Sequence, residues 1–445
     1  MSDVLARQTS PTPVAPVAPA APGLGGRSLA LRAFGWGSSV SAVRLACSFL
    51  SIKVTAVVLG PAGLALVAQL GNLVALLQST LGQALVTGSV RLAAEHADDA
   101  AMRARVRATA LWLAVAVVGA AALALAVSAA PMARWLLADD AHAVVIALVG
   151  VAVAAAVWAD LLHGALGVSK ELGLIGRTQI GAALLGLAVF APSAWRWGLD
   201  GALWASLAVY ALASGLSTAL VLWRSRAVRP REFFGGFDPG LARRLAGFYP
   251  MLIVNGALPP LALILVRDSL AATLGFDAAG LWQAAWRLSE AYQMVIVSSV
   301  TLVFMPALGE RTAQPAAWRH QVLRTLGLAS AATAVLALLI GLLREPIVHV
   351  VLSARFAPAA DLMPVQLVGD VFRVTGWILG MALVAALRTR WFVCVVLLWA
   401  LVFVGGTRAL MPTLGLEAAP WAYLAAGVLQ TALAAWALRD RLRLP

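Results

Sequence analysis

The chain has 445 residues, of which 62% are apolar and only 12% are charged, whereas an ordinary soluble domain has about 25% charged residues. Together with a mean hydropathy of +0.89, this composition excludes a soluble globular protein, a disordered protein and a disulfide scaffold. The net charge is +13, from 33 basic and 20 acidic residues. In a membrane protein such an excess first indicates cytoplasmic basic residues that fix the topology, so we expect no nucleic-acid partner.

Residues 1–27 are rich in Pro and Ala and lack an apolar core, which predicts a disordered cytoplasmic tail. The apolar runs that follow are each about 20 residues long, enough to cross the hydrocarbon core as a helix. They predict an all-α integral membrane protein with twelve helices, at 31–58, 64–90, 108–129, 142–163, 172–193, 200–222, 248–273, 278–305, 321–343, 361–387, 390–410 and 418–438.

The distribution of basic residues predicts the orientation. With the tail inside, cytoplasmic segments hold 23 basic residues and the opposite side holds six, Arg134, Arg196, Arg267, Arg344, Arg355 and Arg408. This bias places both termini in the cytoplasm. The longest cytoplasmic segment, 224–247, then acts as a linker between six-helix bundles at 28–223 and 248–445.

A faint internal repeat supports two halves. Leu59-Gly60, Ala62-Gly63-Leu64 and Gln69 recur as Leu274-Gly275, Ala279-Gly280-Leu281 and Gln283, each time between the first two helices of a half. Six helices per half give both halves the same orientation, so the repeat predicts a pseudo-twofold axis along the membrane normal. Chance similarity in a chain rich in Ala, Gly and Leu is the alternative.

The sequence lacks the motifs of several classes of enzyme and metal-binding protein. We find no Walker A pattern, no paired-His metal motif and no G-x-S-x-G elbow, and no loop is long enough for a catalytic domain. Both cysteines lie in apolar runs, which makes a disulfide or metal site unexpected. A transporter without cofactor, metal or catalytic residues is therefore the expectation.

Charged residues inside predicted helices indicate a polar cavity, because burying them in the membrane is costly. Arg44 lies near the middle of the first helix, and Lys53 lies two turns from its outer end. Nine residues place them on opposite faces. Arg44 is the stronger candidate for a cavity cation, whereas Lys53 could instead extend its ammonium outward.

Two further pairs have i,i+3 spacing, Arg287 with Glu290 and Asp370 with Arg373, so each can form an ion pair within its helix. Pairing could serve only to make burial tolerable. On the other reading, four cations and two carboxylates share one cavity and leave about two positive charges. A cationic cavity favours an anionic group such as phosphate.

Two adjacent prolines, Pro259 and Pro260, fall inside the seventh helix and remove two backbone donors. The helix is predicted to bend or break there. The site is a candidate hinge, with a static kink as the alternative.

The motifs around these residues resemble those of the Wzx-type polysaccharide flippases of the multidrug/oligosaccharidyl-lipid/polysaccharide exporter (MOP) superfamily. The resemblance runs from about residue 28 to the C-terminus and is closest to the lipid III flippases of enterobacterial common antigen, also called O-antigen translocases. It is carried by Arg44 and Lys53 before the turn at 59–64, Gly280-Leu281-Trp282-Gln283, Ser289-Glu290-Ala291-Tyr292 and Gln366-Leu367-Val368-Gly369-Asp370-Val371.

This resemblance implies two six-helix lobes around a central cavity and alternating access for an undecaprenyl-pyrophosphate-linked oligosaccharide, in the bacterial inner membrane. It assigns diphosphate-binding or cavity cations to Arg44, Lys53, Arg267 and Arg373, and it matches Glu290 and Asp370 to acidic positions of possible coupling and Pro259 to a proline. Arg287 departs from the family pattern, as does the Pro/Ala tail, so Arg287 could neutralise Glu290 rather than bind substrate.

Three alternatives stay open. A cation-coupled multidrug exporter of the same fold would need acids in excess of bases in its cavity. A membrane polysaccharide polymerase or ligase would need large outer loops with reactive residues. A lipid II flippase usually has two more helices. We expect a monomer that contacts membrane lipids and works beside the polymerase and chain-length regulator of its pathway.

Overall fold

The computed structural model describes residues 24–442 except 97, 226, 248 and 311–313. The part of the predicted tail at 1–23, together with Arg226 and Arg443, lies outside the described residues. All regular elements within the described residues are helices, which confirms the predicted all-α class. The reason is general: in lipid, a helix satisfies every backbone polar group within its own segment.

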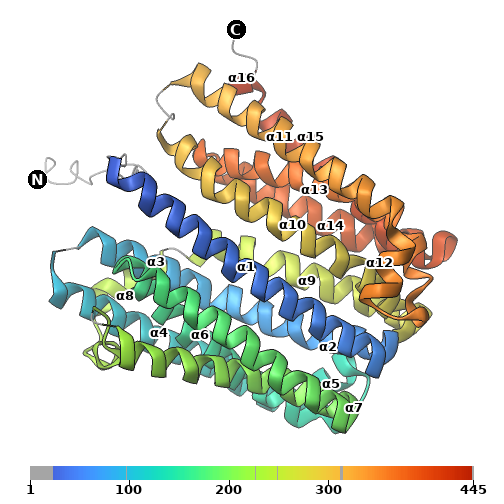
Figure 1. Ribbon diagram of the computed structural model, residues 1–445, viewed down its shortest axis with the longest axis horizontal. Coiled ribbons are helices and arrows are strands. Elements are labelled where there is room, and N and C mark those ends of the chain that lie inside the picture. The colour runs from blue at the N-terminus through green and yellow to red at the C-terminus, as the bar shows by residue number, and fades with distance from the viewer. Residues whose placement is uncertain (1–23, 97, 226, 248, 311–313, 443–445) are drawn as a thin grey trace, which may run out of the picture.

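The helices form two lobes (Figure 1). The N-lobe comprises α1 (Leu24–Val58), α2 (Gly60–Leu77), α3 (Gln83–Glu95), α4 (Ala100–Val127), α5 (Ala129–Leu137), α6 (Ala143–Val168), α7 (Leu172–Arg224) and α8 (Pro239–Ala246). The C-lobe comprises α9 (Tyr249–Leu274), α10 (Phe276–Glu310), α11 (Pro315–Leu342), α12 (Arg344–Val351), α13 (Ala359–Ala385), α14 (Thr389–Leu414), α15 (Ala418–Ala437) and α16 (Arg439–Leu442).

Eleven of the twelve predicted spans each coincide, to within two residues, with one of these helices or with part of one, whereas the span 64–90 covers both α2 and α3. Helix α7 covers two spans, and its direction changes at Gly198, whose φ of 59° and ψ of −135° are not helical. A π-helical turn, Gln78–Gly82, joins α2 to α3. Helix α9 continues through Pro259 and Pro260 without a break. Among the described residues, nine helical stretches are long and apolar enough to cross a membrane, and two of them, 172–224 and 389–437, are 53 and 49 residues long.

The two lobes approach each other at the end where α2, α5 and α12 lie, and they diverge toward the end where α1 begins and α16 lies (Figure 1). We call these the closed end and the open end. The N-lobe has its own apolar core. A second core, at the closed end, is shared between lobes, because Leu64 and Ala65 of α2 pack with Val266 of α9 and Trp282 of α10.

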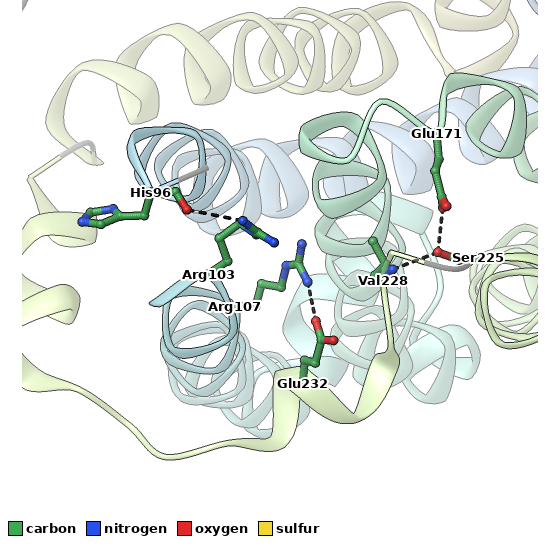
Figure 2. Close-up of polar contacts among 7 residues, drawn as sticks. All are labelled: His96, Arg103, Arg107, Glu171, Ser225, Val228 and Glu232. Atoms are coloured by element: carbon green, nitrogen blue, oxygen red, sulfur yellow. Dashed lines mark hydrogen bonds and ion pairs between the residues drawn. The ribbon is translucent and has the colours of Figure 1, made fainter. Parts of the chain in front are cut away.

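The segment between the lobes is fixed to the N-lobe. In Figure 2, Arg107 of α4 donates to the Glu232 carboxylate at 2.5 Å. Phe233, which is fully buried, packs edge-on against Trp158 of α6 with ring centroids 5.1 Å apart, and the Trp112 indole donates to the Gly235 carbonyl at 3.0 Å. The chain between α7 and α9 therefore belongs to the N-lobe as far as α8, which ends at Ala246.

Candidate functional site: a cationic cavity between the lobes

Two adjoining chambers flank α1 between the lobes. The first has a volume of about 500 Å³ and is lined mainly by α1, α2 and α7. The second has a volume of about 550 Å³ and is lined by α1, α9, α10, α13, α14 and α15. Arg44 and Arg287 line both chambers, so the two form one site divided by the α1 backbone.

Three of the predicted cavity cations, Arg44, Arg287 and Arg373, line this site, and Glu290 lines the second chamber. Three arginines against one glutamate leave two positive charges on the walls. The net charge of the cavity walls is thus the same as the predicted one, about two positive charges, although some of the residues that contribute to it differ. Pro259 also lines the second chamber, which places a proline of α9 at the cavity wall.

Arg287 and Glu290 form the ion pair that their spacing predicts, with 2.9 Å between Nη1 and Oε2. Both side chains remain partly exposed to the cavity, at 34% and 50%. On the other wall, Arg44 donates to Gln179 of α7 at 3.4 Å, which is a long and therefore weak hydrogen bond. Each of the two arginines can therefore exchange its present partner for an incoming anion.

Asp370 and Arg373 do not form the predicted ion pair. The fully buried Asp370 carboxylate instead accepts hydrogen bonds from Tyr292 (2.7 Å), Gln293 (2.7 Å) and Tyr423 (3.0 Å). These donors lie on α10 and α15, so a spacing rule within one helix could not reveal them. Asp370 is separated from the chamber by Tyr423, which lines it.

Arg373 contacts residues of other helices instead of Asp370. Its Nη1 donates to the Gln430 amide oxygen at 3.1 Å, and its guanidinium lies 4.1 Å from the centre of the Trp399 ring. Both partners are neutral. A guanidinium held by an amide and an aromatic face keeps its full charge toward the cavity.

Lys53 does not belong to the cavity lining. Its ammonium donates to the carbonyls of Val350 (2.8 Å) and Leu352 (2.5 Å), at the C-terminal end of α12. A cation there satisfies carbonyls that have no helical partner. The expectation that Arg44 and Lys53 face different ways is confirmed, and the expectation that Lys53 adds its charge to the cavity is corrected by these contacts.

Arg267 is also absent from the chamber walls and is buried to 1% exposure. Its terminal nitrogens donate to Gln69 (2.5 Å) and to Gln283, and they lie 3.2 and 3.1 Å from the Asn72 amide oxygen when that amide is oriented toward them. The two glutamines are the ones that recur in the internal repeat. Sequence reasoning noted the repeat but missed that both copies meet at one arginine.

Comparisons with known proteins agree with this architecture. No protein-family model matches the chain. It is 26% identical to the Lipid III flippase of Escherichia coli (strain K12) over 391 residues, which cover 88% of this chain and 93% of the relative, and equally identical to the Lipid III flippase of Shigella flexneri.

Solved structures resemble most of the chain. An inward-facing multidrug resistance MATE family transporter of the MOP superfamily superposes with a TM-score of 0.77 at 15% identity, covering 90% of this chain and 98% of its own. The outward-facing conformation of such a transporter gives 0.63 at 15% identity, with 91% and 94% covered. The resemblance to MOP-type flippases is thereby confirmed, and the chain is a multi-pass membrane protein with the MOP transporter fold.

Proposed function

We propose that this protein is a flippase that moves an undecaprenyl-pyrophosphate-linked oligosaccharide, of the O-antigen or common-antigen type, from the cytoplasmic to the periplasmic leaflet. The observation that carries the proposal is the net positive cavity lined by Arg44, Arg287 and Arg373. Arginine binds phosphate oxygens in a bidentate fashion. The names of the two relatives, both Lipid III flippases, support the same substrate class.

In the proposed cycle, the diphosphate enters between the lobes from the open end, which we assign to the cytoplasm together with both termini. Arg44 and Arg373 bind it, and a phosphate oxygen competes with Glu290 for Arg287. The sugars fill the chambers, and the lipid tail stays in the bilayer. The lobes then rock, with Pro259 and Pro260 as the hinge, and expose the cavity at the closed end.

Glu290 and Asp370 are candidate coupling groups in this cycle. Glu290 loses its ion-pair partner whenever the substrate takes Arg287, so it is free to bind a proton or cation at that moment. Asp370 is held by three donors, of which Gln293 and Tyr423 line the second chamber, so rearrangement of Tyr423 on substrate binding would change the solvation of Asp370.

The decisive experiment is Arg44→Ala in a strain deleted for the gene, with protein level controlled. We expect surface polysaccharide to fall and lipid-linked repeat units to accumulate on the cytoplasmic leaflet, whereas the control Arg408→Ala, at the closed end of α14, should retain both at normal levels. Normal polysaccharide in Arg44→Ala would overturn the assignment of Arg44.

The competing multidrug exporter shares the fold of the solved relatives. It would transport cations, and a wall with three arginines and one glutamate repels them. Drug susceptibility of a sensitised strain separates the two functions, because the flippase should leave it unchanged.

A further inference from the structure

The two copies of the internal repeat meet at the closed end. Gly60 and Gly275, with φ of 71° and 88°, form the turns that start α2 and α10. Across the lobes, the Asp277 carboxylate accepts from the Ala62 backbone N–H at 3.1 Å, which caps the N-terminus of α2. Gly280 lies so close to Pro61 that a Cβ would be 1.9 Å from the Pro61 carbonyl oxygen. The repeat therefore builds the seal between lobes.

Arg267 lies just inside this seal. On α9 it follows Leu263, a residue of the second chamber, by one helical turn, and its partners Gln69 and Asn72 alternate with Ala68, Leu70 and Gly71 of the first chamber. The guanidinium is thus placed between the cavity and the closed end, at the junction of both chambers.

The hydrogen-bond partners of Arg267 are all neutral. They are the amide oxygens of Gln69, Asn72 and Gln283, with the Trp282 ring 5.8 Å away. Its Nε is buried and has no hydrogen-bond partner among the residues that the structure describes. A buried guanidinium with this set of partners retains an unsatisfied donor and its full charge, and both favour an anionic ligand.

The three amide acceptors of Arg267 come from both lobes. Gln69 and Asn72 belong to α2 of the N-lobe, whereas Gln283 belongs to α10 of the same lobe as Arg267. When the closed end opens, α2 removes two of the three acceptors. If the empty protein opened, the Arg267 guanidinium would keep only the Gln283 acceptor, which is unfavourable unless another acceptor replaces the two that are lost.

We propose that Arg267 is a second anion site, created when the closed end opens, at which phosphate oxygens of the substrate replace the amides of Gln69 and Asn72. This inference rests on the proposed flippase function. Its consequence is that the loaded protein opens and the empty one stays shut. We call the contacts of Arg267 with Gln69, Asn72 and Gln283 the latch, because they hold the closed end shut until the diphosphate replaces two of them.

The test measures opening directly. Spin labels are placed on the exposed residues Trp197 of α7 and Leu343 before α12, by Trp197→Cys and Leu343→Cys in a Cys47→Ala, Cys394→Ala background. The full chain in nanodiscs receives undecaprenyl diphosphate or the uncharged undecaprenol, and pulsed dipolar spectroscopy gives the inter-lobe distances.

We expect the open population to rise at least tenfold with the diphosphate relative to undecaprenol. Arg267→Gln keeps a side chain that can bond the amides but removes the charge, so it should give equal open populations with both lipids. Gln69→Leu should open more with undecaprenol and still respond to the diphosphate. Arg408→Gln, a charge removal at the same end outside the latch, should respond like the parent.

Two results would overturn the anion site: a diphosphate response that survives in Arg267→Gln, or equal opening of the parent with both lipids while it retains bound undecaprenyl diphosphate. In either case the flippase proposal stands. If the parent retains no diphosphate lipid and Arg44→Ala leaves polysaccharide normal, the flippase proposal fails as well.

Discussion

Replacing Gly280 with alanine should force the lobes apart at the closed end. The added Cβ would lie 1.9 Å from the carbonyl oxygen of Pro61, 2.3 Å from its carbonyl carbon and 2.8 Å from its Cα, whereas ordinary van der Waals contact begins at 3.4 Å. All three are backbone atoms, so no rotamer change relieves the clash. The backbones of α2 and α10 must separate by about 1.5 Å.

Overpacking of this kind typically costs about 1–3 kcal/mol. Because the cost applies only to the closed arrangement, it shifts the closed-to-open ratio by about 5- to 150-fold. A matched control is Gly405→Ala in α14, where a Cβ would meet no atom within 4 Å. We expect no shift in that variant.

The assay is the inter-lobe distance between labels at positions 197 and 343, read without lipid substrate, together with surface polysaccharide in cells. Gly280→Ala should show a larger open population and reduced polysaccharide. A monodisperse protein with a normal unfolding midpoint shows that the variant is folded. An unchanged distance distribution in such a protein would refute the inference that the repeats form the seal.

Three further outcomes are expected. Tyr423→Phe removes one donor from the buried Asp370 carboxylate, which should lower stability by about 1–3 kcal/mol, seen as a lower unfolding midpoint in detergent; an unchanged midpoint would contradict the hydrogen-bond assignment. Phe233→Ala empties the contact with Trp158 and should cost about 3–5 kcal/mol, with faster proteolysis of the 224–247 segment; equal cleavage rates would argue that this segment is not fixed. The Arg388 guanidinium lowers the pKa of Asp440 from 3.8 to about 2, so this pair stabilises the protein above pH 4 and loses that effect as the pH falls toward 2. Because the Asp440 side chain is largely exposed, Asp440→Asn should lower the unfolding midpoint only slightly at pH 7, and the difference should shrink on acidification; a difference that grows instead would reverse the sign of the linkage.

Hydropathy sufficed to predict the helices, because each apolar run of about 20 residues has one stable way to cross lipid. The helical period predicted in addition that Arg44 and Lys53 lie on different faces of the first helix, because their spacing in the sequence alone decides the face. For these two predictions, which depend on one helix and its own geometry, sequence and structure agree.

Contacts between helices could not be predicted in this way. The spacing of Asp370 and Arg373 permits an ion pair, but donors on α10 and α15 surround the carboxylate in its place. The length of the segment 224–247 predicts a cytoplasmic linker, and only its contacts with other helices, such as the packing of Phe233 on Trp158, show that it is attached to the N-lobe. The repeat is visible as a sequence pattern, whereas the contact between its copies depends on the approach of α2 to α10, which lie far apart in the sequence.

The closest backbone contact of the seal at the closed end is made by residues that have almost no side-chain freedom to lose. Gly280 faces the Pro61 backbone, and Ala62 receives the cap from Asp277. Ordering glycine, alanine and proline costs essentially no rotamer entropy, whereas ordering a long side chain costs up to about 2 kcal/mol. The contact between Gly280 and Pro61 therefore adds almost no side-chain entropy penalty to closure, in contrast to the long side chains of Arg267, Gln69 and Gln283 that meet beside it.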